Sequence, residues 1–325
     1  MGKLNPVIVA LAAALSIVGP AAAEVYPSRP ITVVVPGPAG GPPDTLLRIL
    51  SDRMQASLGQ PIVIENAGGA GGTIAVGRVA RAAPDGYTVS IGHVASHVFS
   101  SIVYRLQHDA LNDLAPVGLL TTTPTWIIAT NTVPAKDLKE LIAWLKARPD
   151  EASAGIVGHG SPAHLCGVHF QNSTGTRFKF VPYRGGAPLM QDLVAGHIQL
   201  ACAEASNTRG LVQSGKLKAY AVMSKTRWAK APDVPTIDEA GVPGLYVPFW
   251  HGLWVPRGTS GDVVAKLNAA TVAALMDPDV SKRLIELGHE LPAPAQRTPE
   301  ALATIHRAEI EKWAPVIKAA NIKPE

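Results

Sequence analysis

The feature that most constrains the fold is a repeated unit in which a short apolar strand runs into a glycine-rich loop and then a helix. The first unit joins the apolar run Ile31–Val35 to the loop 36–44 and to a helix that stops at Gly59. Further strands are expected at 62–65, 88–91, 126–129, 154–157, 178–181 and 198–203. Buried strands that do not alternate, joined by helices, indicate mainly parallel sheets flanked by helices and hence an α/β fold.

The order of these units favours two lobes, which also suits a chain of 325 residues. The chain would leave the first lobe near 121–125 and come back near 222–226. Helices near 263–276 and 299–319 would then pack on the first lobe. The predicted division is a first lobe of residues 24–122 plus 226–325 and a second lobe of residues 123–225.

The composition excludes two classes of protein. With 47% hydrophobic and 17% charged residues, the chain is apolar enough to build a core, so it is not a disordered protein. The net charge of +4 is small, and the lysines and arginines are scattered rather than clustered. We therefore expect no nucleic-acid partner.

The N-terminus resembles a secretory signal peptide. A positive start at Lys3 precedes an apolar run over 7–18 and the small residues Ala21–Ala23. A membrane anchor is the alternative, but the apolar run covers only 12 residues, whereas a spanning helix needs about 20. The sequence therefore predicts removal of residues 1–23 and export of the remainder to the periplasm.

Export changes the interpretation of the two cysteines, Cys166 and Cys202. In an oxidising compartment they could form a disulfide or stay as two buried thiols. Neither CxxC nor HxxxH spacing accompanies them, so no metal site is expected.

The loop 36–44 could bind an anion, because it places backbone N–H groups at the start of a helix. It lacks the lysine ending of a phosphate loop, and Pro42 and Pro43 break the dinucleotide fingerprint, so no nucleotide cofactor is expected. A tight turn without a ligand is the alternative. Asp44 is predicted to cap the helix.

Two serine–histidine pairs raise the alternative of an exported hydrolase: Ser96 with His97, and Ser161 with His164. No Gly-x-Ser-x-Gly motif surrounds either serine, which disfavours a nucleophile. These side chains would instead cap helices or donate to a ligand. Arg184 could hold a carboxylate or be a solvated loop residue.

Several ordered motifs resemble one family. They are Tyr-Pro-Ser-Arg-Pro-Ile at 26–31, Leu-Gly-Gln-Pro-Ile-Val-Ile-Glu-Asn at 58–66, Ala-Ala-Pro-Asp-Gly-Tyr-Thr at 82–88, Val-Pro-Tyr-Arg-Gly at 181–185 and Ala-Pro-Asp-Val-Pro-Thr-Ile-Asp-Glu-Ala-Gly at 231–241. From about residue 26 to the C-terminus the chain resembles the Bug family, the periplasmic solute receptors of tripartite tricarboxylate transporters.

The resemblance implies a two-lobed periplasmic binding protein of the Venus-flytrap type, monomeric, with no catalysis and no cofactor. Its ligands would be small carboxylates, namely dicarboxylates, tricarboxylates, aromatic acids or acidic amino acids, and its partners membrane transporter subunits. A sensor kinase as the partner is the alternative. By position, the implied ligand-binding residues are Pro38, Ala39, Gly40, Gly41, Ser96, His97, Gly160, Ser161, His164, Tyr183, Arg184 and Glu204.

The chain also departs from the family it resembles. Gly37 stands where an aromatic residue is usual, the loop Gly160–Ala163 is poorer in serine, and Glu204 stands where aspartate is usual. The resemblance would place Cys166 and Cys202 on the ligand side of one lobe, which favours a disulfide between them.

Overall fold

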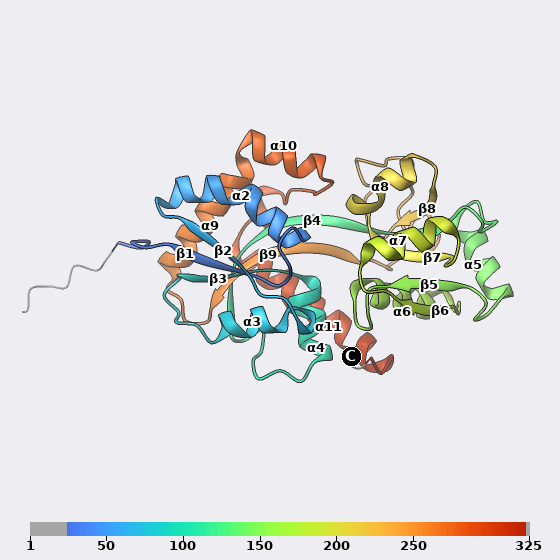
Figure 1. Cartoon of the computed structure of the whole chain (residues 1–325), viewed down its shortest axis with the longest axis horizontal. Coiled ribbons are helices and arrows are strands. Elements are labelled where there is room, and N and C mark those ends of the chain that lie inside the picture. The colour runs from blue at the N-terminus through green and yellow to red at the C-terminus, as the bar shows by residue number, and fades with distance from the viewer. Residues whose placement is uncertain (1–24, 323–325) are drawn as a thin grey trace, which may run out of the picture.

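The computed structural model describes residues 25–322, so the predicted signal peptide lies outside the described residues. Two groups of elements lie side by side, joined by two long strands (Figure 1). The nine strands of the described region follow the order β2-β1-β3-β9-β4-β7-β5-β6, with β8 paired to β4. The long strands β4 (Leu114–Thr130) and β9 (Pro248–Pro256) pair antiparallel and connect the two groups.

The first lobe contains β1 (Ile31–Val35), β2 (Ile62–Asn66) and β3 (Thr88–His93), which pair in parallel. Val33 and Val35 enter one core, and Val34 enters the other. Both faces are thus covered, which explains why the strand is apolar without alternation. The first core takes α2 (Pro42–Leu58), α9 (Gly261–Met276) and α10 (Pro278–Glu286), and the second takes α3 (Thr73–Ala80) and α11 (Pro299–Ala319).

Short helical turns complete this lobe between β2 and β4. They are η1 (Ala70–Gly72), η2 (Ala95–Phe99) and α4 (Ser100–Val103), and a further turn, η3 (Pro294–Gln296), precedes α11. No helix within residues 25–322 has the length and apolar character needed to cross a membrane.

The second lobe is built on β5 (Ser153–Ile156), which pairs in parallel with β6 (Lys179–Pro182) and β7 (Leu200–Glu204), while β8 (Leu217–Val222) pairs with β4. Its helices are α5 (Leu138–Ala147), α6 (Pro162–Thr174), α7 (Gly186–Ala195) and α8 (Ala205–Gln213). Alternate residues of β4 again serve two cores: Trp126 and Ile128 pack with α7 and α8, whereas Ile127 packs with α5 and α6.

The return to the first lobe comes later than residue 226, where the sequence placed it. Trp228 is buried in the second-lobe core, with its ring 5.7 Å from that of Trp126. Ile237 donates its backbone N–H to Val222, the last residue of β8. The segment 223–247 therefore packs on the second lobe, and β9 carries the chain back.

Candidate ligand site

The carboxyl ends of the parallel strands from both lobes meet at one cleft. Pro36 follows β1 and His93 ends β3 in the first lobe, while Val157 follows β5 and Glu204 ends β7 in the second. All four line cavities in the structure. In open α/β sheets, ligands bind outside the carboxyl ends of the strands, so this is where a ligand is expected.

Two adjoining cavities occupy the cleft. The inter-lobe cavity, of about 300 Å³, is lined by Pro36, Gly71 and His93 of the first lobe and by residues 157–162 of the second. The second-lobe cavity, of about 450 Å³, lies among the starts of α6, α7 and α8. The two share Val157, Ser161 and Pro162. Their volumes suit a small molecule, since ligand pockets are typically about 300–1,000 Å³.

Three helix N-termini border the second-lobe cavity. The N-cap residues are Ser161 for α6, Gly185 for α7 and Glu204 for α8. Such ends carry unpaired backbone N–H groups and the positive end of the helix dipole, which favour an anion. At α6 the turn is fixed because the Ser161 hydroxyl accepts from the backbone N–H of His164 at 3.3 Å, and Nδ1 of His164 accepts from that of Gly160 at 3.0 Å.

Glu204 brings a carboxylate to the start of α8. Its side chain is half-buried, and the resulting loss of hydration raises its pKa to about 7, against the hydrogen bonds from Asn207 and Ser206. Nδ2 of Asn207 donates to Oε2 of Glu204 at 3.1 Å. The Thr208 hydroxyl donates to the Glu204 carbonyl at 3.0 Å and accepts from the Trp126 indole at 2.8 Å.

The imidazoles of His93 and His164 are neutral at pH 7. Burial lowers the pKa of His93 to about 4, and burial together with the nearby His159 lowers that of His164 to about 4. Nδ1 of His93 accepts from the backbone N–H of Ala95 at 3.2 Å. Among the described residues that line the two cavities there is no lysine or arginine. An anion here would be held by neutral donors and helix dipoles.

Ser96 and His97 lie inside the first lobe and line neither cavity. His97 is fully buried, and its ring stacks on Trp254 at 4.0 Å between centroids. The Ser96 hydroxyl lies 3.0 Å from Nδ1 of His97 and donates to the His93 carbonyl at 3.2 Å. Both side chains are thus turned into the core behind His93. A buried serine in this position offers no accessible nucleophile for a hydrolase.

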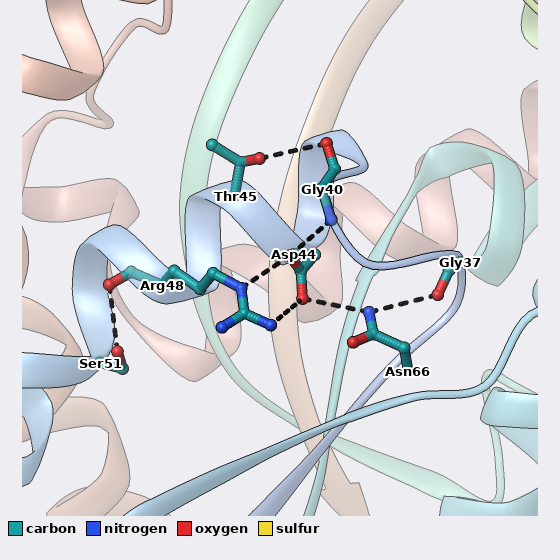
Figure 2. A network of polar contacts seen from close by, with 7 residues as sticks. All are labelled: Gly37, Gly40, Asp44, Thr45, Arg48, Ser51 and Asn66. Atoms are coloured by element: carbon teal, nitrogen blue, oxygen red, sulfur yellow. Dashed lines mark hydrogen bonds and ion pairs between the residues drawn. The ribbon is translucent and has the colours of Figure 1, made fainter.

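The loop 36–44 is held by a buried carboxylate (Figure 2). Asp44 accepts from the backbone N–H of Gly40 at 2.8 Å, from Arg48 at 2.8 and 3.1 Å and from Asn66 at 3.1 Å. Arg48 lowers the pKa of Asp44 to about 2. The N-cap of α2 is Gly41, so the prediction that Asp44 caps this helix is wrong. Asp44 lies in the first turn and reaches back to the loop instead.

The structure leaves Pro38, Ala39 and Gly40 exposed and Gly41 half-exposed at this turn, and none of the four lines either cavity. Tyr183 and Arg184 also lie outside both cavities. The Tyr183 hydroxyl donates to Asp192 at 2.7 Å, and Arg184 is exposed. Of the predicted residues, the structure brings Gly160, Ser161 and Glu204 to the cavities, with His164 directly behind them.

Cys166 of α6 and Cys202 of β7 are joined by a disulfide, with Cα atoms 6.2 Å apart. Cys202 lines the second-lobe cavity, so the bond ties the helix that starts at Ser161 to the strand that ends at Glu204. Within residues 25–322 no group of three or more His, Cys, Asp or Glu is arranged to hold a metal ion.

Sequence reasoning missed several cavity residues, namely His93, Thr125, Met190, Asn207 and Phe249. For His93 and Asn207 a signal was present, because His93 ends a strand and Asn207 lies in the helix turn directly after one. Thr125 and Phe249 lie on the two connecting strands and carry no such signal.

Comparison with known proteins shows which family the chain resembles. The family model for the tripartite tricarboxylate transporter family receptor matches residues 46–322. A protein from the TAR-I ttuE-ttuC' intergenic region of Agrobacterium vitis is 38% identical over 300 residues, 92% of this chain and 87% of the relative. Protein BugT of Bordetella pertussis is 33% identical and covers 99% of each chain.

Two solved structures from Rhodopseudomonas palustris are also similar. MatC with bound malate is 40% identical, with a TM-score of 0.79 over 90% of this chain and 100% of that one. A second protein, solved with adipate, is 34% identical, with a TM-score of 0.80 over 92% of this chain and 100% of that one. The matching family and the similar solved structures are solute-binding proteins rather than enzymes. The chain belongs to the tripartite tricarboxylate transporter receptor family, the Bug-type periplasmic solute-binding proteins.

Proposed function

We propose that this protein, once exported, captures a small carboxylate between its lobes and delivers it to the membrane subunits of a tripartite tricarboxylate-type transporter. The observation that carries the proposal is the convergence of three helix N-termini, two of them with neutral N-cap residues, on a cavity without a lysine or arginine among its described lining residues. Such a site stabilises a negative charge through backbone N–H donors. The relatives solved with malate and adipate support an acid as ligand.

Capture would work by stabilising a closed arrangement of the lobes. A ligand that touches both His93 in the first lobe and Ser161 in the second favours the conformation in which these walls are close together. The connecting strands β4 and β9 would act as the hinge. The lobes already touch where the rings of His169 of α6 and Trp313 of α11 are 5.5 Å apart.

A thermal-shift screen, followed by calorimetric titration, tests carboxylate capture. The purified, ligand-stripped protein is titrated with dicarboxylates, tricarboxylates, aromatic acids and acidic amino acids. A bound acid at 100 times its Kd should stabilise the protein by about 2.7 kcal/mol. Failure of every acid to shift the melting temperature would refute the proposal.

The transporter partnership needs a cellular test. Deleting the gene should abolish uptake of the radiolabelled acid, and re-expression should restore it. Uptake that persists in the deletion strain, with a lost transcriptional response to the acid, would assign the protein to a sensor kinase instead.

A further inference from the structure

The wall of the second-lobe cavity is mainly apolar. Its apolar side chains include Val157, Ala163, Leu189, Met190, Ala203 and Phe249. Leu189 and Phe249 are themselves buried and fixed in the surrounding cores. A ligand that fills this cavity buries its body against hydrocarbon side chains, so an apolar body would bind more tightly than a polar one.

The polar side chains at the α8 end of the cavity come from Glu204, Asn207 and Thr208. Nδ2 of Asn207 donates one N–H to Glu204, and the Asn207 side chain keeps a carbonyl oxygen that can accept a hydrogen bond from a ligand. The Thr208 hydroxyl has both of its roles filled within the protein. Glu204 adds a carboxyl group and is the one ionisable side chain among the described residues that line this cavity.

The three helix N-termini around the cavity are therefore not equivalent. At α8, the N-cap residue is Glu204, whose side chain makes no capping hydrogen bond to the helix backbone but brings a carboxyl group to the cavity. At α6 and α7, the cap residues Ser161 and Gly185 are neutral. A ligand carboxylate is favoured at the α6 and α7 end and disfavoured at the α8 end, where it would face another acid.

We infer that the ligand is a monocarboxylic acid with an apolar body whose far end carries a hydrogen-bond donor, a hydroxyl or an ammonium group, facing Glu204. This inference rests on the proposed function and narrows its ligand class, because it excludes a second carboxylate at the far end. The raised pKa of Glu204 agrees with this inference, because no positively charged group of the protein lowers it and a donor on the ligand would supply that interaction.

The test uses three matched sets of acids that differ only at the far end. The sets have a four-carbon chain, a six-carbon chain and a benzene ring as the body. The six-carbon set is adipate, hexanoate, 6-hydroxyhexanoate and 6-aminohexanoate. The ring set is terephthalate, benzoate, 4-hydroxybenzoate and 4-(aminomethyl)benzoate. The four-carbon set is succinate, butyrate, 4-hydroxybutyrate and 4-aminobutyrate.

Calorimetric titration of the wild-type protein gives the ranking. In the set that fits best, a donor-terminated acid should bind at least tenfold more tightly than the matching dicarboxylate, and comparing hydroxyl with ammonium identifies the donor. A dicarboxylate that binds as tightly or more tightly overturns the inference but leaves carboxylate capture intact. No binding by these acids overturns the inference, and no binding by the tricarboxylates and acidic amino acids of the screen as well overturns the proposed function itself.

The variant Glu204→Gln assigns the preference to this side chain. It should lower the preference for the donor-terminated acid over the dicarboxylate at least tenfold. Glu286→Gln, the same change at an exposed position on α10, should leave the preference unaltered. An unchanged preference in Glu204→Gln overturns the inference. Should that variant fail to fold, the wild-type ranking alone still decides.

Discussion

Asp44 is predicted to stabilise the fold through its contacts with the loop 36–44, and Asp44→Asn tests this. The carboxyl side chain is 1% exposed and accepts hydrogen bonds from Gly40, Arg48 and Asn66. Asparagine keeps the shape but replaces one acceptor oxygen with a donor, which then faces other donors. Since the Arg48 side chain is 56% exposed, solvent screens the ion pair, and most of the loss comes from the buried hydrogen bonds.

We expect Asp44→Asn to lower the free energy of unfolding at pH 7 by about 2–3 kcal/mol, the scale for hydrogen bonds to a charged group. Urea unfolding followed by circular dichroism measures it, and the melting temperature should fall by about 3–5 °C. The control is Asp52→Asn, the same change at an exposed position on the same helix, for which we expect less than about 0.5 kcal/mol.

The pH dependence follows from the pKa of Asp44, which is lowered from 3.8 to about 2 in the folded protein. A lowered folded pKa means that the stabilisation is present above pH 3.8 and is lost as the pH falls toward 2. The difference between wild type and Asp44→Asn should therefore shrink over this range. Equal stability at pH 7, or a difference that stays constant down to pH 2, would refute the reasoning.

Three further predictions concern the site and its surroundings. Replacing Cys202 by Ser should lower the free energy of unfolding by about 3–4 kcal/mol, because the disulfide closes a loop between positions 36 residues apart. The denatured, unreduced wild-type protein should resist alkylation, and stoichiometric alkylation of both cysteines would contradict the bond. Ser161→Ala and Ser260→Ala each remove a helix cap and should each cost about 1 kcal/mol, but only the former should weaken ligand binding. Because burial lowers the pKa values of His93 and His164 to about 4, stability should fall as the pH drops from 6.5 toward 4. Urea titrations across that range measure it, and a flat profile would count against buried neutral imidazoles.

The strands and most helices could be predicted because their signals are local. Two helical layers cover the two sides of the run Val33–Val35, so every residue of the run is apolar, and this lack of alternation is visible in the sequence. The cap of α2 could not be separated from its first turn, because Asp suits both positions and the distinction depends on where Arg48 and Asn66 lie.

The direction of a side chain at the end of a strand could not be predicted either. His93 is the last residue of β3 and His97 follows four residues later, yet His93 lines the cleft and His97 stacks on Trp254 in the core. The turn of η2 decides between them, and it depends on tertiary packing. The path of segment 223–247 could not be predicted for a similar reason, because nothing in the sequence around Trp228 indicates which lobe buries its side chain.

A crystal structure with the tightest-binding acid from the screen tests carboxylate capture between the lobes most directly. We predict the ligand carboxylate at the start of α6, near Ser161, with the body of the ligand in the second-lobe cavity and first-lobe contact through the wall that includes His93. An acid bound outside these two cavities, or contacting one lobe alone, would contradict it.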